Sequence, residues 1–188
     1  MAFQLSTFKG ALEHGGARPS LFDFRIDSFP SSITLLAGMQ YHVNVTAIPP
    51  LTVTPIERQY FGRTVKIPGD MVFGDLTTTI INTEDFDIRN GIERWMVLIN
   101  KHNDNKMNEI GNDDWVSSGT LSQYSKTGSK LMEYNFIDIW PQTISEIALS
   151  YDTASDIEQF DVTWAYNYYT MKSKNSITNT SFTNLPHD

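Results

Sequence analysis

Hydrophobic and polar residues alternate along two stretches in the first quarter of the chain, residues 20–29 and 39–48. A period of two predicts half-buried β-strands. The apolar positions are Phe22, Phe24 and Ile26 in the first stretch, and Tyr41, Val43 and Val45 in the second. Pro49 and Pro50 end the second predicted strand, because proline cannot donate a hydrogen bond to a neighbouring strand.

Residues 49–69 keep an extended character but are repeatedly interrupted, which predicts an arm with few strand partners of its own. The interruptions are Pro55, Gly62 and Pro68. Thr64–Ile67 is a candidate short strand within the arm. Residues 70–82 then predict a longer strand with Gly74 at a bulge.

The apolar period changes from two to that of a helix between residues 85 and 99. The apolar stripe consists of Ile88, Ile92, Trp95, Met96 and Ile99. This spacing predicts an amphipathic α-helix, with Asn82 or Thr83 as its N-cap.

The second half of the chain begins with a polar segment and then returns to strand patterns. Residues 101–130 predict a long polar excursion with room for a short hairpin, followed by strands at 131–140, 144–151 and 157–169. One face of the last strand is apolar: Phe160, Val162, Trp164, Tyr166 and Tyr168. Residues 1–19 and 170–188 are expected to be an irregular lead-in and a polar tail. The order of elements predicts a mainly β protein, an antiparallel sandwich or barrel with one flanking helix, in a single domain over residues 1–188.

Composition narrows the class of function. The 188 residues carry a formal net charge of −8, which disfavours conventional nucleic-acid binding, and the absence of cysteine excludes disulfide scaffolds and thiolate chemistry. The N-terminal sequence lacks a signal-peptide pattern, and no apolar run reaches the length of a membrane helix.

Motifs for catalysis, cofactors and metals are missing at the sequence level. Gly15, Gly16 and Arg18 precede a strand and not a helix, so they do not form a phosphate loop. The histidines lack ligand spacing, and the acidic run at 104–114 lacks the ligand pattern of an EF-hand. We therefore expect no enzyme activity, no cofactor and no metal site.

Several sequence blocks, in order, resemble the tail tube proteins of contractile-tailed bacteriophages, above all the T-even-like group. The blocks are "GGARPSLFDFRI" (15–26), "YFGRTVKIPGDMVFGDLTTTIIN" (60–82), the helix at 85–99, "IDIWPQTISEIALSYD" (137–152) and "IEQFDVTWAYNYY" (157–169). The segment 101–130 and the tail after 170 depart from the resemblance.

The resemblance implies a structural protein that forms hexameric rings with a continuous inner β-barrel, stacked into a hollow tube inside a contractile sheath. The implied partners are other copies of the same chain, the sheath protein, the tape-measure protein, a baseplate tube initiator and a tail terminator. DNA would pass through the lumen without specific binding. The protein would be a virion component assembled in the bacterial host cytoplasm, with no membrane anchor.

The same resemblance assigns residues to three kinds of surface. Inter-subunit and inter-ring contacts are expected at Arg18, Arg58, Tyr60, Arg63 and Lys66, with the arm reaching an adjacent ring. Lumen-facing positions are expected at Asn44, Asp75, Thr77 and Thr79. Sheath-facing positions are expected at Arg89, Glu93 and Arg94, on a helix whose Trp95 packs against the sheet.

Two other functions stay open at this point. One is the tube of a phage-derived contractile injection system, or a specialised tube initiator or cap. The other is a carbohydrate-binding β-sandwich, for which Tyr166, Tyr168 and Tyr169 would have to lie on a solvent-exposed face.

Overall fold

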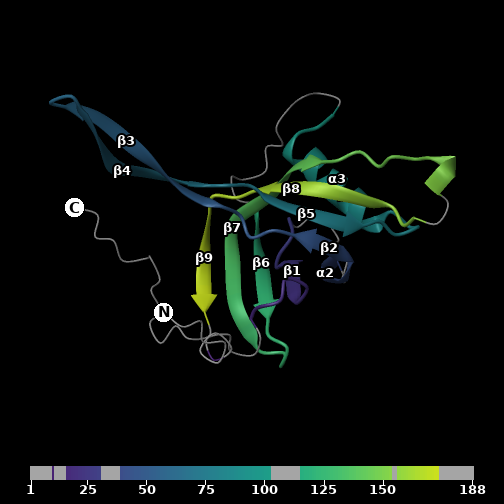
Figure 1. The fold of residues 1–188 in the computed structure, drawn as a ribbon. Helices are drawn as coiled ribbons and strands as arrows, with labels where there is room; N and C mark the ends of the chain where they lie inside the picture. Colours follow the sequence, from purple (N-terminus) through teal and green to yellow (C-terminus); the bar gives the residue numbers. More distant parts are fainter. Residues whose placement is uncertain (1–9, 11–15, 31–38, 103–114, 154–155, 174–188) are drawn as a thin grey trace.

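Antiparallel strands dominate the computed structural model, which describes residue 10 and residues 16–30, 39–102, 115–153 and 156–173. The elements are β1 (Phe22–Ile26), α2 (Met39–His42), β2 (Val43–Thr46), β3 (Leu51–Tyr60), β4 (Arg63–Phe73), β5 (Leu76–Ile81), α3 (Asp87–Ile99), β6 (Ser117–Tyr124), β7 (Lys130–Ile144), the 3₁₀ turn η2 (Tyr151–Thr153), β8 (Gln159–Ala165) and β9 (Tyr168–Ser173). Together they form a seven-stranded sheet and a separate two-stranded ribbon (Figure 1).

The large sheet consists of two halves that share β7. The first half-sheet has the order β1-β6-β7-β9, and the second has the order β7-β8-β5-β2. In Figure 1, β6, β7 and β9 run down the page while β5 and β8 run across it. Bulged strands that pass from one layer to the other are the usual corners of such crossed packing. The body is therefore a sandwich with a continuous corner.

The corner lies at an extra residue in β7. Asp138 has a left-handed φ of 57° at the register shift between β6 and β7. Its Oδ2 accepts a hydrogen bond from Nδ2 of Asn167 at 2.7 Å, and the backbone N–H of Asn167 donates to Ile137 O at 3.1 Å. Asn167 lies in the gap between β8 and β9, so both strand pairs turn at the same level.

The core fills the angle between the two half-sheets. Alternation along β5 and β8 buries one face of each strand, and three rings meet there: Trp164 lies 5.9 Å from Trp95 and 6.0 Å from Phe24, measured between ring centroids. The indole N–H of Trp164 donates to Thr78 Oγ1 at 2.9 Å. This satisfies both polar groups inside the core.

The predicted helix is present as α3, and Trp95 packs against the sheet as expected. The expected N-cap is wrong, because the cap position is Phe86, with a φ of 52° and no capping side chain. Asn82 instead bonds to Glu158 through both its side chain and its backbone N–H, at 2.9 and 2.8 Å. A tertiary contact thus outcompetes local capping.

The polar segment 101–130 was expected to be a long excursion with room for a short hairpin. The hairpin is present, since β6 pairs with β7 across a turn at residues 125–129, but β6 is an integral strand between β1 and β7 and not part of an excursion. Buried hydroxyls replace apolar side chains along this strand. Thr120 Oγ1 donates to Asp27 Oδ2 at 2.6 Å, and Ser117 Oγ donates to the carbonyl of Ser28. Small hydroxyl side chains with partners can be buried without a large penalty. Residues 103–114 lie outside the described residues.

Three further predicted strands have different bounds. The strands expected at 131–140 and 144–151 are one strand, β7, which ends at Ile144. The strand expected at 157–169 is divided into β8 and β9, so Tyr168 is 47% exposed and not buried with Trp164. β9 continues to Ser173, inside the expected tail, and residues 174–188 lie outside the described residues.

The stretch 39–48 begins with a helical turn, α2, and only Val43–Thr46 is a strand. Asn44 is the extra residue in the register between β2 and β5. Since a one-residue slip turns side chains to the other face, Val45 is 54% exposed instead of buried beside Val43. Tyr41, also expected to be buried, is 81% exposed on α2.

Candidate assembly surfaces

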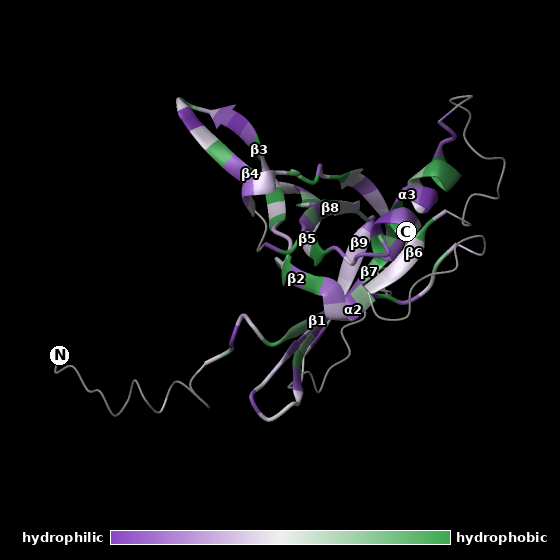
Figure 2. Cartoon of the chain, turned by 90° about the vertical axis from the view of Figure 1, so that its right-hand side faces the viewer, coloured by the Kyte–Doolittle hydropathy of each residue, from purple (hydrophilic) through white to green (hydrophobic). Residues whose placement is uncertain are grey.

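The arm is a ribbon made of β3 and β4, and it projects from the body (Figures 1 and 2). Contrary to expectation, its strands pair with each other over most of their length. Pro55 lies opposite Pro68, next to a register shift, so the prolines occupy the place where pairing is already irregular. No residue from Leu51 to Pro68 is buried or half-buried. The arm is thus a paired ribbon with one register shift near its prolines, and its residues 51–68 contribute nothing to the core.

The register places an apolar and basic surface on one face of the outer part of the arm. Residues directly opposite each other share a face, so the pairs Ile56/Ile67, Arg58/Val65 and Tyr60/Arg63 project together. We call this set the distal stripe. Its apolar side chains are exposed by 46–68%. Within the described residues, neither Arg58 nor Arg63 forms an ion pair.

The opposite face of the outer arm is polar and internally paired. Lys66 Nζ lies 3.3 Å from Glu57 Oε1, and Gln59 donates to Thr64 Oγ1 at 2.8 Å. Lys66 therefore lies on the other side from Arg58, Tyr60 and Arg63, with which it was grouped at the sequence level. Of the two faces of the outer arm, the distal stripe is therefore the one that combines exposed apolar groups with arginines that form no ion pair within the described residues.

The tip of the arm is a two-residue turn made by Phe61 and Gly62. Both have positive φ, 45° and 73°, as a type I′ hairpin turn requires. Asn or Gly is the usual first residue, and a bulky side chain in this conformation costs about 1 kcal/mol. Phe61 is nevertheless 90% exposed, with its ring edge-to-face on Tyr60 at 4.6 Å.

The root of the arm is fixed to the body by several contacts. The N–H of Gly74 donates to Pro50 O at 3.0 Å, and a Cβ at Gly74 would lie 2.7 Å from the Pro50 ring. Tyr166 donates its hydroxyl to Gly74 O at 2.5 Å, and burial raises the pKa of this phenol, which keeps it a donor. Phe73 packs on Tyr169 at 5.3 Å.

The outer face of the second half-sheet is rich in hydroxyls. Pairing aligns Thr77 with Thr163 and Thr79 with Asp161, and Thr79 donates to Asp161 Oδ1 at 2.6 Å. We call these residues, together with Thr143, the hydroxyl face. None of the residues paired in this half-sheet (43–46, 76–81, 140–144 and 159–165) is Lys or Arg. Sequence reasoning found Thr77 and Thr79 but missed their neighbours, although the alternation in 157–169 already set Asp161 and Thr163 opposite Phe160.

The other two predicted lumen residues lie at the margins of this half-sheet. Asn44 is exposed at the bulge of the edge strand β2. Asp75 is exposed between β4 and β5, where the arm meets the body. Both residues are therefore close in sequence to the strands of this half-sheet, but neither is one of the paired residues that form the hydroxyl face.

Helix α3 packs on the opposite side of the second half-sheet from the hydroxyl face. Arg89 lies 5.3 Å from the ring of the buried Phe160, forms an ion pair with Glu93 at 3.0 Å and donates to Ser145 O at 3.2 Å. Arg89 is therefore largely occupied within the fold. Glu93 and Arg94 are exposed.

Arg18 is exposed at the start of the described N-terminal segment, two residues after Gly16, which has a φ of 81°. Its carbonyl accepts from the side chain of Gln123 at 3.4 Å. Gly15, the other proposed hinge residue, lies outside the described residues. Pro19, the residue after Arg18, lines an apolar groove.

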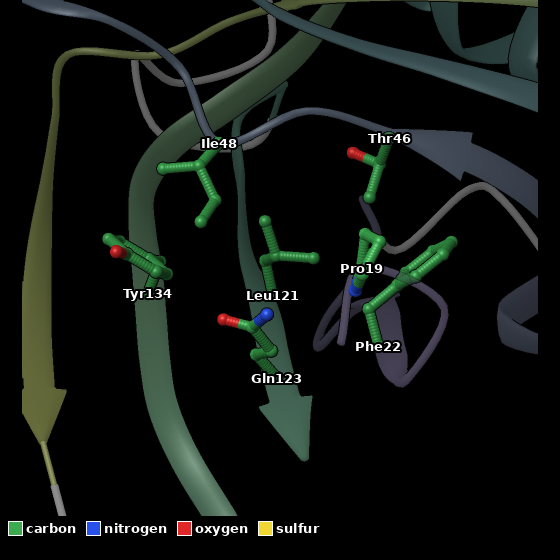
Figure 3. A pocket seen from close by; sticks show the side chains of 7 residues that line it. All are labelled: Pro19, Phe22, Thr46, Ile48, Leu121, Gln123 and Tyr134. Atoms are coloured by element: carbon green, nitrogen blue, oxygen red, sulfur yellow. The ribbon is translucent and has the colours of Figure 1, made fainter. Parts of the chain in front are cut away.

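This groove lies between the inner face of the first half-sheet and the β2–β3 connection, and we call it the root groove. It has a volume of about 220 Å³. Figure 3 shows its side chains pointing into one shared space. The lining residues are Pro19, Phe22, Thr46, Ile48, Leu121, Gln123 and Tyr134.

The described residues contain no group of three or more metal-ligating side chains. None of the helices in the described part of the chain has the length and hydrophobicity needed to cross a membrane. The surfaces that distinguish this molecule are therefore the arm, the hydroxyl face and the root groove.

Solved structures with the same fold belong to tubes of contractile systems. The tube-terminating cap of the anti-feeding prophage has a TM-score of 0.61 and 15% identity, covering 92% of this chain and 95% of that chain. The PVC sheath-tube complex of an extracellular contractile injection system, in its extended state, has a TM-score of 0.56 and 18% identity, covering 92% and 99%. At these identities the likeness shows the fold: a mainly β tube-protein fold.

The chain belongs to the phage tail tube protein family, whose model matches residues 18–172. The tail tube protein gp19 of Enterobacteria phage T4 is 27% identical over 164 residues, covering 85% of this chain and 94% of that relative. The residues matched by the family model include the arm, the helix and β6. The sequence resemblance to tail tube proteins is therefore confirmed.

Proposed function

We propose that this chain is the tube subunit of a contractile phage tail and assembles into stacked hexameric rings that form the conduit for the genome. Family membership makes it a structural tail tube protein. The observation that carries the assembly is the arm, which exposes a regular apolar stripe that its own body cannot cover. Exposed apolar surface of this extent marks an interaction site.

The two sides of the second half-sheet suit the inside and the outside of a tube. The residues of the hydroxyl face include one carboxylate, Asp161, and no cation, so this face gives phosphate no partner and lets DNA slide past. Helix α3 covers the other side. In this arrangement Thr77, Thr79 and Asp161 line the lumen, and Asn44 and Asp75 lie near its rim.

The outward side would then present the helix to the sheath protein. Glu93 and Arg94 are exposed there, whereas Arg89 contributes mainly by holding α3 to the sheet. Sheath, tape-measure protein, baseplate initiator and terminator are the remaining proposed partners. The site of assembly would be the host cytoplasm, and the final location the virion tail.

Contacts between copies would use the arm. In a ring or stack of identical copies each contact is head-to-tail, and the arm of one copy reaches the next. Arg58 and Arg63 on the distal stripe would meet carboxylates there, while Lys66 keeps Glu57 as its partner. Arg18 would add a contact at the N-terminal edge. Pairing of edge strands across the boundary would close the inner barrel.

Excision of the arm tests this proposal. Because Gly74 N–H and Pro50 O are already hydrogen-bonded, residues 51–73 can be replaced by a two-residue Asn-Gly turn without opening the body. We expect the full chain to form hollow tubes by negative-stain electron microscopy and the excised chain to remain dispersed while its body still unfolds cooperatively in urea. Tubes formed equally well by the excised chain would contradict the role of the arm.

The same images separate the alternatives. Isolated subunits with glycan affinity would favour a carbohydrate-binding module, although Tyr166 and Tyr169 are half-buried in the cluster at the arm root. Tubes alone would not separate a phage tail from an injection device. A phage whose only tube protein is the excised chain separates them, because loss of its infectivity would assign the tube to a phage tail.

A further inference from the structure

Phe61, at the tip of the arm, combines two unfavourable features in the isolated chain. Its ring is 90% exposed, and its backbone has a φ of 45°, a conformation that Asn or Gly adopts far more easily. A strained backbone that carries an exposed aromatic ring points to a function at that residue. The tip therefore has the properties of an anchor that becomes buried in another molecule.

The root groove is an apolar site able to take such a ring. A cavity of about 150 Å³ lined by apolar side chains can hold a benzene molecule, and this groove measures about 220 Å³. Five of its seven lining residues are apolar or aromatic, and the inner-face residues Leu121 and Tyr134 form its floor. Gln123 and Thr46 add polar groups at its margins.

The arm cannot fill the root groove of its own chain. Thr46 and Ile48 line the groove and lie just before β3, whereas Phe61 lies just after it. The ten residues of β3 separate the two by about 33 Å in an extended strand. An arm held at its root by Pro50, Gly74 and Tyr166 therefore carries its tip away from the groove (Figure 1).

Charge favours a second copy of the same chain as the occupant. Residues 57–66 contain one Glu, two Arg and one Lys, a net charge of +2, so the rest of this −8 chain carries −10. Arg58 and Arg63 flank Tyr60 on the distal stripe. Asp75 is exposed at the arm root, next to Gly74, whose N–H donates to Pro50 O. A basic tip is thus complementary in charge to the acidic remainder of a second copy.

We propose that the Tyr60–Phe61 tip of one copy inserts into the root groove of a second copy, with Phe61 as the anchor residue. The contact is head-to-tail, so every copy offers one tip and one groove. The length of the arm then sets the offset between neighbouring copies. This inference rests on the proposed assembly function and names the surface that receives the arm.

Cross-linking between two single-cysteine variants tests the contact. The natural chain has no cysteine, so a thiol-reactive bis-maleimide has no background target. Tyr60→Cys protein, which carries the thiol at the tip and keeps the Phe61 ring, is mixed with Gln123→Cys protein under assembly conditions, and the cross-linked dimer is measured by gel electrophoresis. The matched control replaces Gln123→Cys with Arg25→Cys, an exposed position on the opposite face of the same half-sheet. We expect cross-linking only with Gln123→Cys.

A second variant separates an anchor from a turn residue. Phe61→Asn creates the favoured Asn-Gly turn, so it should raise the stability of the dispersed subunit while it removes the anchor ring. We expect it to raise the protein concentration needed for tube formation by about tenfold or more, the effect of leaving one phenyl group exposed. Phe61→Tyr should assemble nearly as well as the natural chain.

The outcomes distinguish this inference from the function on which it rests. If tubes form but Tyr60→Cys cross-links equally to both partners or to neither, the groove is not the receiving site. If Phe61→Asn assembles at the natural concentration, Phe61 is not an anchor. If the natural chain forms neither rings nor tubes, the proposed function itself is wrong.

Discussion

The body and the arm are built from similar alternating sequences but differ in what covers their apolar faces. In the body, the apolar faces of β5 and β8 meet α3 and the first half-sheet, and Trp95 and Trp164 are fully buried. In the arm, Ile56 and Ile67 project from an equally regular ribbon and stay about half exposed. Alternation therefore predicts that a face is buried, but not in which molecule the covering surface lies.

The difference has an energetic consequence. Burying an aliphatic side chain stabilises by about 1.5–3 kcal/mol, and the body obtains this within one chain. A two-stranded ribbon without a covered face is at best marginally stable in water. The arm should therefore gain most of its order when copies assemble, and changes in the two regions should affect different measurements.

The largest effect is expected for Trp164→Ala in the body. The change removes ring contacts to Trp95 and Phe24 and leaves Thr78 without its indole donor. Aromatic truncation in a core costs about 3–5 kcal/mol, which should lower the urea midpoint of the dispersed subunit strongly and prevent assembly. Ile56→Ala in the arm is the comparison. The free energy of unfolding of its dispersed subunit, obtained from the urea midpoint, should change by less than about 0.5 kcal/mol.

The next effect separates the two faces of the arm. Val65→Glu places a carboxylate on the distal stripe, whereas Thr64→Glu places one on the opposite face at the adjacent position. Both should leave the urea midpoint of the subunit nearly unchanged. Tube formation, measured by light scattering and microscopy, should be lost for Val65→Glu and retained for Thr64→Glu. Equal loss in both would mean that the two faces do not differ in function.

A smaller effect is expected at the junction of the two regions. Tyr166→Phe removes the hydroxyl that donates to Gly74 O. Loss of one such hydrogen bond costs about 1 kcal/mol and should loosen the angle between arm and body. Tyr168→Phe, at an exposed position of β9, is the control and should not change subunit stability.

The smallest expected effect is an acid sensitivity confined to the body. Lys130, at 2.6 Å, and Lys172, at 3.4 Å, hold the pKa of the Glu133 carboxyl below its usual range. Because the folded pKa lies below the unfolded one, this stabilisation is present above the unfolded pKa, near 4.3, and is lost as the pH falls through the folded value. Glu133→Gln should therefore lower the urea midpoint slightly at pH 7 and not at pH 2. An equal difference at both pH values would contradict the ion-pair account.

Much of the body could be predicted from the sequence, because its strongest signals are local. The helix at 85–99 and the strand at 20–29 have long, regular periods that tertiary contacts only reinforce. The resemblance to tail tube proteins came from the order of several blocks, which no single period shows. Thr77 and Thr79 were predictable for the local reason, since the alternation along their strand already places both side chains on one face.

The failures share a physical cause, which is that the deciding interactions are not local. The sequence of β6 predicts a polar excursion because its Ser and Thr side chains are polar. Their hydrogen-bond partners, such as Asp27, are far away in the sequence and come close only in the folded chain. Val45 changes face because of a bulge at Asn44, and the strand at 157–169 divides where Asn167 meets Asp138. The root groove was not predicted, since its lining comes from segments that are far apart in the sequence.

Hydrogen–deuterium exchange of the dispersed subunit and of the assembled tube tests the central claim most directly. Amides of β6 and β8 should be protected in both states, since their strands are paired and covered within one chain. Amides of β3 and β4 should exchange rapidly in the subunit and become protected in the tube. An arm that exchanges at the same rate in both states would show that assembly does not complete it, and would contradict the account.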